Sequence, residues 1–102
     1  ILSRLNQIGA NFDLTHFRHH APYLEREGRI EMRLISDREQ TVCIGDAEIS
    51  LSEGEHIVTE HSHKYDLGQF EDMARAAGFR LTKQWSDERD WFSVCLLEVD
   101  ER

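Results

Sequence analysis

The spacing of apolar residues changes along the chain, and each change predicts a different kind of element. Over positions 1–8 apolar residues recur at helical intervals, and Gly9 follows them at the point where a left-handed turn would end a helix. Residues 13–15 carry the start signal of a second, short turn or helical piece. We therefore expect residues 1–15 to form a helical lead-in.

Residues 16–63 contain short strand-like runs separated by turn residues, and they predict a small antiparallel β-meander. Over 29–34 apolar and charged residues alternate, so we expect one buried face and one solvated face that carries two arginines and a glutamate. Pro22 indicates that the strand near 17–24 is irregular or lies at an edge. Further strands are expected at 41–44, 47–51 and 55–62, with turns at 25–28, 37–40, Gly45-Asp46 and 52–54.

From position 66 the period becomes helical again. Asp66 and Gln69 have the spacing of a capping box, an apolar stripe follows, and Gly78 stands where the helix should end. The elements expected next are a strand at 79–85, a polar turn at 87–90 and a last strand at 91–99. The last strand is apolar on both faces, which is typical of a strand inside a covered sheet, so its second edge requires a neighbour. We therefore read 64–102 as a helix-strand-strand unit whose exposed apolar surface favours self-association.

Charge and composition narrow the class of protein. Twenty acidic against twelve basic residues give a net charge of −8, which argues against nucleic acid and anionic membranes as partners. No apolar run is long enough to cross a bilayer. Cys43 and Cys95 lie in strand-like runs without CxxC spacing, so we interpret both as core thiols of a cytoplasmic protein. The chain begins on Ile1 within an apolar stripe, which we interpret as a cut end.

Glu60 and Ser62 are the strongest candidates for a functional site. Strict alternation over 55–62 would put His56, Val58, Glu60 and Ser62 on one face, with the last two side chains about 7 Å apart. A carboxylate that accepts one ring N–H and a hydroxyl that meets the other nitrogen would suit an imidazole. The alternative interpretation is a pair of solvated residues at the end of a strand.

Other kinds of site have weaker support. The pairs His19-His20 and His61/His63 lack an evident third ligand nearby, so we expect no metal. The sequence contains no GxGxxG, GxxxxGK[ST], HExxH or GxSxG motif, and neither cysteine lies in a polar turn. We therefore assign no catalytic residue.

Two stretches carry a family resemblance: Arg-Ile-Glu-Met-Arg-Leu at 29–34, and Thr-Glu-His-Ser-His-Lys-Tyr at 59–65 before the capped helix. Residues 8–13 and 76–93 extend it over nearly the whole chain. The chain resembles the C-terminal part of the histidine-specific, S-adenosylmethionine-dependent N-α-methyltransferases that make hercynine for ergothioneine biosynthesis.

The resemblance implies a fold and a site. It implies an α/β chain, the C-terminal fragment of a Rossmann-like class I methyltransferase, in which 64–102 completes the sheet and the meander at 16–63 forms part of the substrate pocket. In the family, the residues that match Glu60 and Ser62 contact the substrate imidazole, and the residue that matches Met32 lines the pocket. The S-adenosylmethionine site is expected mainly in an N-terminal part that is missing here, so this chain alone would be inactive.

Two other functions remain open. The first is a methyltransferase of the same build that acts on another amino acid or small amine. The feature that distinguishes it from a histidine methyltransferase is whether Glu60 and Ser62 converge on a pocket of imidazole size. The second is a non-catalytic module for ligand binding or dimerisation.

Overall fold

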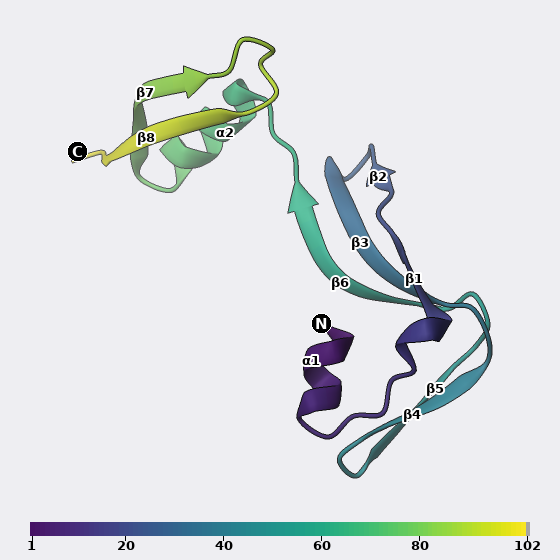
Figure 1. Ribbon diagram of the computed structural model, residues 1–102. Coiled ribbons are helices and arrows are strands. Elements are labelled where there is room, and N and C mark those ends of the chain that lie inside the picture. Colours follow the sequence, from purple (N-terminus) through teal and green to yellow (C-terminus); the bar gives the residue numbers. More distant parts are fainter. Residues whose placement is uncertain (102) are drawn as a thin grey trace. The chain divides into compact units, whose positions relative to one another are not determined.

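The computed structural model describes residues 1–101. These residues form two compact units, one over Ile1–Lys64 and one that begins at Tyr65. Both combine helices with strands, and all strand pairings are antiparallel among the described residues (Figure 1). No helix among them is long and apolar enough to span a membrane.

The first unit contains α1 (Leu2–Gln7), a 3₁₀ turn (Leu14–His16), and the strands β1 (Phe17–His20), β2 (Tyr23–Leu24), β3 (Arg29–Ser36), β4 (Gln40–Ile44), β5 (Ala47–Leu51) and β6 (His56–His63). As predicted, α1 ends just before Gly9, whose φ of 114° is in the glycine-favouring region. The side chain of Asn6 then clamps the following loop, because it donates to the Phe12 carbonyl and accepts from the Phe12 N–H, both at 2.8 Å.

Strand β3 is the centre of the main sheet. β1 and β2 pair with one of its edges and β6 pairs with the other. The predicted irregularity at Pro22 is confirmed, because the chain leaves the sheet between β1 and β2 and the Pro22 carbonyl accepts from the Glu31 N–H at 3.0 Å. Pro22 itself has no N–H to give to the sheet, and an irregular edge is a position where this loss is tolerated.

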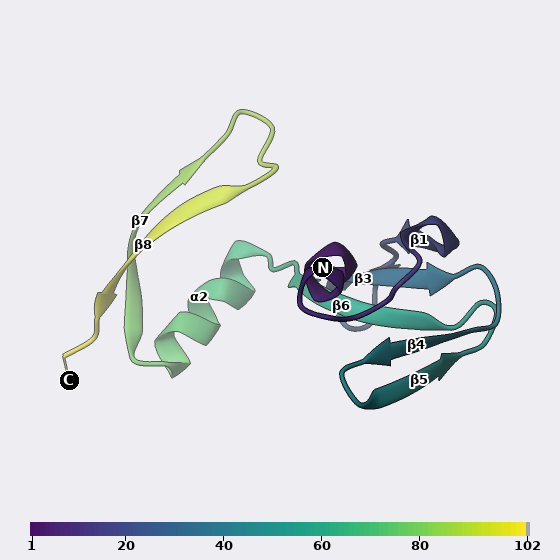
Figure 2. The ribbon, with the colours of Figure 1, turned by 60° about the horizontal axis from the view of Figure 1, so that its bottom comes forward.

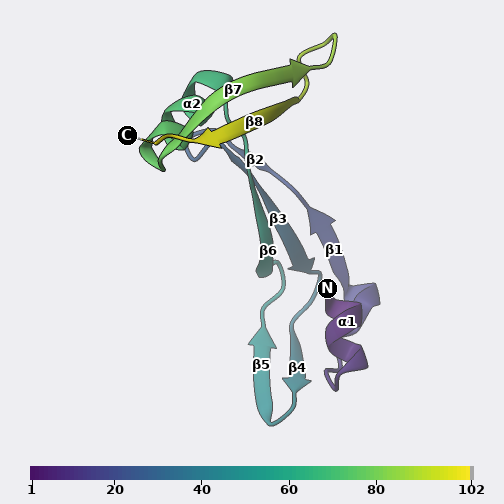
Figure 3. The same cartoon turned by 90° about the vertical axis from the view of Figure 1, so that its left-hand side faces the viewer.

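The expected meander is wrong in its connectivity. β4 pairs with β5 across the predicted Gly45-Asp46 turn, but β3 pairs with β6, so the four strands form one long, nested hairpin (Figures 1 and 3). At the junction of the two pairs, the buried Ser36 donates its N–H to Glu55 and accepts the N–H of Gly54 at its carbonyl. These bonds continue the backbone hydrogen bonding between the β3–β6 pair and the β4–β5 pair.

The core of the first unit lies where α1 packs against the inner hairpin, which is the pair formed by β4 and β5. Its buried members are Leu2, Phe12, Val42 and Leu51, with six partly buried apolar residues around them. Val42 is only 1 % exposed, and the pleat turns its neighbour Cys43 to the opposite side, where it is exposed. The interpretation of Cys43 as a core residue is therefore wrong, and that of Cys95, which is half-buried, holds only in part.

The second unit contains α2 (Leu67–Ala76), β7 (Phe79–Ser86) and β8 (Ser93–Val99). Its predicted capping box is present, since Asp66 accepts from the Gln69 N–H at 2.8 Å and the Gln69 side chain accepts from the Asp66 N–H at 3.2 Å. Gly78 has a φ of 85° and leads directly into β7. Helix α2 packs against β7, and β7 pairs with β8 in a long twisted ribbon (Figure 2).

Strand β8 starts two residues later than expected. The carboxylate of Asp87 accepts the N–H groups of Trp91 (2.7 Å) and Phe92 (3.2 Å), and these bonds keep both residues in the turn. Within residues 1–101 β8 pairs only with β7, and several of its apolar side chains are exposed. The strand expected inside a covered sheet therefore has one free edge in the described part of the chain.

Candidate functional site

The three residues singled out from the sequence lie on one face of the β3–β6 pair. Met32 stands directly opposite Glu60, and Ile30 stands directly opposite Ser62. Directly paired residues on antiparallel strands project to the same side of the sheet, and their Cβ atoms are about 5 Å apart. Glu60 and Ser62, two positions apart on β6, project to this same side. We call this surface, made of Ile30, Met32, Glu60 and Ser62, the candidate face.

The expected alternation along β6 is wrong at one point. The register slips between Met32 and Arg33, so that Thr59 is an extra residue between Glu60 and Val58. Its hydroxyl donates to the Met32 carbonyl at 3.3 Å. Because of this β-bulge, Val58 pairs with Arg33 and lies on the side opposite to Met32. His56 and Val58 therefore do not share a face with Glu60 and Ser62.

The polar groups of the candidate face differ in their surroundings. Within residues 1–101 the exposed Glu60 carboxylate makes no hydrogen bond or ion pair, so its acceptor sites are free for a ligand. Ser62 is half-buried, and its Oγ accepts a hydrogen bond from Lys64 Nζ at 2.8 Å. An open hollow of about 280 Å³ lies beside Glu60 and is lined by Val58, Thr59, Glu60 and His61. Met32 and Ser62 do not line it.

Lys64 was not among the residues that sequence reasoning selected. The signal that could have found it is the same alternation that links Glu60 to Ser62, continued for one more step. Its backbone N–H donates to the Gly28 carbonyl at 2.8 Å, which extends the β3–β6 pairing beyond the end of the strand.

The opposite face of the same strands carries a buried charge cluster. Glu31 is only 8 % exposed, and Arg33 holds its Oε2 through Nε (2.7 Å) and Nη2 (2.6 Å). Its Oε1 lies 3.2 Å from Nε2 of His61 and 3.7 Å from Nη2 of Arg29. The expectation of a solvated charged face is therefore wrong, because three basic groups surround the carboxylate and exclude water from it.

This cluster sets the protonation of Glu31. The hydrogen bond from Arg33 holds the pKa of the carboxyl below its usual value of 4.5, although burial acts in the opposite direction. Glu31 is therefore ionised at neutral pH. Since His61 pairs directly with Glu31 across the strands, the cluster ties β6 to β3 immediately behind the candidate face.

The described residues form no evident site for a metal or a nucleotide cofactor. The described residues contain no group of three His, Cys, Asp or Glu side chains arranged around a common point. His61 and His63 instead contact each other edge to face, with ring centroids 6.3 Å apart. The part of the chain that the structure describes also has no glycine-rich turn between a strand and a helix that would cradle a nucleotide.

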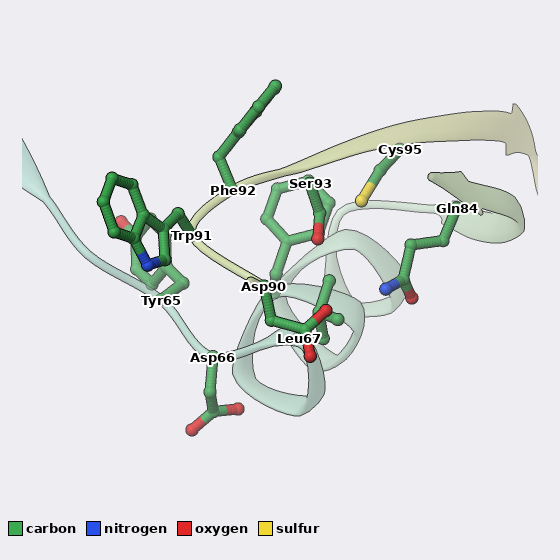
Figure 4. A pocket seen from close by; sticks show the side chains of 10 residues that line it. Tyr65, Asp66, Leu67, Gln84, Asp90, Trp91, Phe92, Ser93 and Cys95 are labelled. Atoms are coloured by element: carbon green, nitrogen blue, oxygen red, sulfur yellow. The ribbon is translucent and has the colours of Figure 1, made fainter. Parts of the chain in front are cut away.

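A larger hollow, of about 630 Å³, lies in the second unit. Figure 4 shows the rings of Tyr65 and Trp91 at one end of it and the side chains of Gln84 and Cys95 at the other. Trp91 is 77 % exposed, and Phe92 beside it is exposed as well. Its lining includes Ser93 and Cys95 as well as Asp66 and Asp90, but among the described residues the Ser93 hydroxyl is hydrogen-bonded to Ser86 and neither Ser93 nor Cys95 is hydrogen-bonded to a carboxylate, so we assign the hollow no chemistry.

Comparisons with known proteins place the chain in one family over almost its whole length. Residues 1–99 match the family model described as histidine-specific methyltransferase, SAM-dependent. The histidine N-alpha-methyltransferase of Mycobacterium tuberculosis is 33 % identical over 99 residues, which cover 94 % of this chain and 31 % of that protein. The protein of the same name from Mycolicibacterium smegmatis is 34 % identical over 92 residues, or 88 % of this chain and 29 % of that protein. The chain thus spans less than a third of these relatives.

Proposed function

Because the chain belongs to the family of histidine-specific, S-adenosylmethionine-dependent methyltransferases, we propose that it is the C-terminal region of an enzyme that methylates the α-amine of L-histidine. The product would be hercynine, the precursor of ergothioneine. The observation that carries the proposal is the candidate face, where Met32, Glu60 and Ser62 come together from two strands.

The chemistry of this face is complementary to an imidazole. A neutral imidazole ring has one N–H donor and one nitrogen acceptor. The free carboxylate of Glu60 would accept the N–H, and the hydroxyl of Ser62 would meet the other nitrogen, while Met32 offers an apolar wall to the ring. Side chains without this donor and acceptor pattern would leave polar groups unpaired in the bound state, which is an effective basis for rejection.

The residues of this chain to which we assign a role would bind and orient the substrate. S-adenosylmethionine, when bound, supplies an electrophilic methyl group. The described residues offer no nucleotide cradle, so we assign none of them to the cofactor and derive no step through it. With the imidazole held by Glu60 and Ser62, the α-amine at the other end of the substrate would be aligned for attack, and such positioning lowers the barrier without a covalent intermediate.

The second unit supports the same assignment. We infer that α2, β7 and β8 are the terminal elements of a Rossmann-like methyltransferase sheet. Support comes from β8, which is apolar on both faces and keeps one edge unpaired within the described residues. The thiols of Cys43 and Cys95 are free, which fits a reduced, cytoplasmic setting.

An assay of methyl transfer tests the proposed function. The full-length protein would be incubated with S-adenosylmethionine and L-histidine, and methylated products would be detected by mass spectrometry. We expect methylation of histidine, a loss of roughly tenfold or more in kcat/KM for Glu60→Ala, and normal activity for Glu48→Ala, a matched exposed glutamate on β5. Methylation of a different amine in preference to histidine, or equal activity of Glu60→Ala and wild type, would contradict the proposal.

A further inference from the structure

The hydrogen bond between Lys64 and Ser62 restricts what the Ser62 hydroxyl can do. A lysine ammonium has three donors and no acceptor, so at 2.8 Å the Ser62 oxygen must accept from it. One of the two lone pairs of the oxygen is therefore occupied. The adjacent positive charge also polarises the O–H bond, which makes the hydroxyl a better donor and a poorer acceptor.

The position of Lys64 is set by the backbone. Its N–H donates to the Gly28 carbonyl at 2.8 Å, and the Gly28 N–H donates to the Leu24 carbonyl at 2.9 Å. Gly28 adopts a φ of 63°, a conformation that glycine takes without steric cost. The turn that joins β2 to β3 thus anchors the residue that follows β6, and the ammonium is held on the same side as Glu60 and Ser62.

We propose that Lys64 is a specificity-determining positioning residue, which commits the Ser62 hydroxyl to donate its proton to the ring of the substrate. This inference rests on the proposed function. With Ser62 as donor and Glu60 as acceptor, the face matches a neutral imidazole in one orientation only. The ring N–H points to Glu60 and the ring lone pair points to Ser62.

The charges of the face favour the same form of the ring. Glu60 alone would attract an imidazolium, whose two N–H groups would place a donor against the donor of Ser62. The ammonium of Lys64, next to Ser62, opposes that cation and offsets the carboxylate. Histidine side chains are mostly neutral above a pH of about 6.5, so the face is matched to the form that prevails at neutral pH.

A double-mutant cycle in the full-length enzyme tests this inference. KM and kcat for L-histidine would be measured for wild type, Lys64→Met, Ser62→Ala and the double variant, at pH 8 where the ring is neutral. Lys64→Met keeps most of the length of the side chain but removes the donor, and Lys64→Arg restores a donor. We expect Lys64→Met to raise KM roughly three- to tenfold with kcat nearly unchanged, and Lys64→Arg to recover most of this loss.

The cycle separates the role of Lys64 from a general structural one. If Lys64 acts through the hydroxyl, Lys64→Met has no further effect on KM once Ser62 is alanine. Additive effects of the two substitutions, or no effect of Lys64→Met on KM in an enzyme that depends on Glu60, would overturn the inference and leave the proposed function intact. A wild-type enzyme that does not methylate histidine would overturn the proposed function itself, and this inference with it.

Discussion

Met32 on β3 stands directly opposite Glu60 on β6, and the single extra residue at Thr59 separates this pair from Val58, which lies on the other face of the sheet. The side-chain period of a strand is two, so a slip of one residue moves a side chain to the other face of the sheet. Because of the bulge, β6 presents Glu60 and Ser62 on the candidate face, whereas Val58, before the bulge, is paired with Arg33 on the opposite face.

The bulge gives a first prediction. Deletion of Thr59 removes the extra residue, so Val58 and Glu60 become neighbours and regular alternation keeps them on opposite faces, as they are in the bulged strand. We expect histidine affinity in the full-length enzyme to stay within about threefold of wild type, because Glu60 and Ser62 keep their common face. Insertion of one alanine between Glu60 and His61 should instead turn Ser62 away from Glu60 and lower the affinity roughly tenfold or more. Unchanged affinity after the insertion would show that the common face of Glu60 and Ser62 does not bind the substrate.

The buried Glu31 cluster predicts a dependence of stability on pH. The folded-state pKa of Glu31 is depressed, so its contribution to the free energy of unfolding is complete above about pH 4.5 and is lost as the pH falls below that value. We expect the melting temperature of wild type to decline over this acid range more steeply than that of Glu31→Gln.

The same variant has a second expected effect at neutral pH. Glu31→Gln leaves the guanidinium of Arg33 without its charged partner, so the melting temperature should be clearly lower than in wild type. Exposed Glu39 supplies the control, since Glu39→Gln should change neither the melting temperature nor its pH profile. Identical acid profiles of Glu31→Gln and wild type would contradict the account of the cluster.

The inner hairpin offers a test of side-chain orientation on neighbouring residues. Val42 is fully buried and Cys43 is exposed, although the sequence suggests that both are apolar core positions. Val42→Ala should lower the free energy of unfolding by about 1–3 kcal/mol, whereas Cys43→Ala should change it by less than about 0.5 kcal/mol. Urea denaturation of the two variants measures both values, and equal losses would mean that the orientation of β4 is different.

The cap of α2 gives a prediction for the second unit. Asp66→Ala removes the acceptor of the Gln69 N–H and should cost about 1 kcal/mol of stability. Asp66→Ser, which restores a capping oxygen, should recover most of it. Asp72→Ala, an exposed change within the same helix, should cause no loss, since alanine is the better helix former. Thermal unfolding followed by circular dichroism distinguishes the three, and a stable Asp66→Ala would argue against the capping box.

Local features were predictable from the sequence because their causes are local. Gly9, Pro22, the Gly45-Asp46 turn and the Asp66 capping box each act within a few residues, and the structure confirms all four. The connectivity was not predictable in this way. The pairing of β3 with β6 joins segments some thirty positions apart, and nothing in either segment alone prefers that partner to β4.

The candidate site was predictable in its residues but not in its geometry. Alternation placed Glu60 and Ser62 together, and a family resemblance added Met32. The bulge at Thr59 left no trace in the pattern, because one inserted residue changes the face without changing the composition of the strand. The burial of Glu31 was missed because a charged residue in an alternating strand is usually solvated, unless three basic groups converge on it from two strands.

The most direct test of the central claim is a calorimetric titration of the full-length protein with L-histidine in the presence of S-adenosylhomocysteine, for wild type and Glu60→Ala. The account predicts selective binding of histidine by wild type and affinity at least roughly tenfold weaker for Glu60→Ala, because the ring N–H loses its acceptor. An absence of histidine binding, or binding of the same strength in both proteins, would contradict the claim that this face recognises the imidazole.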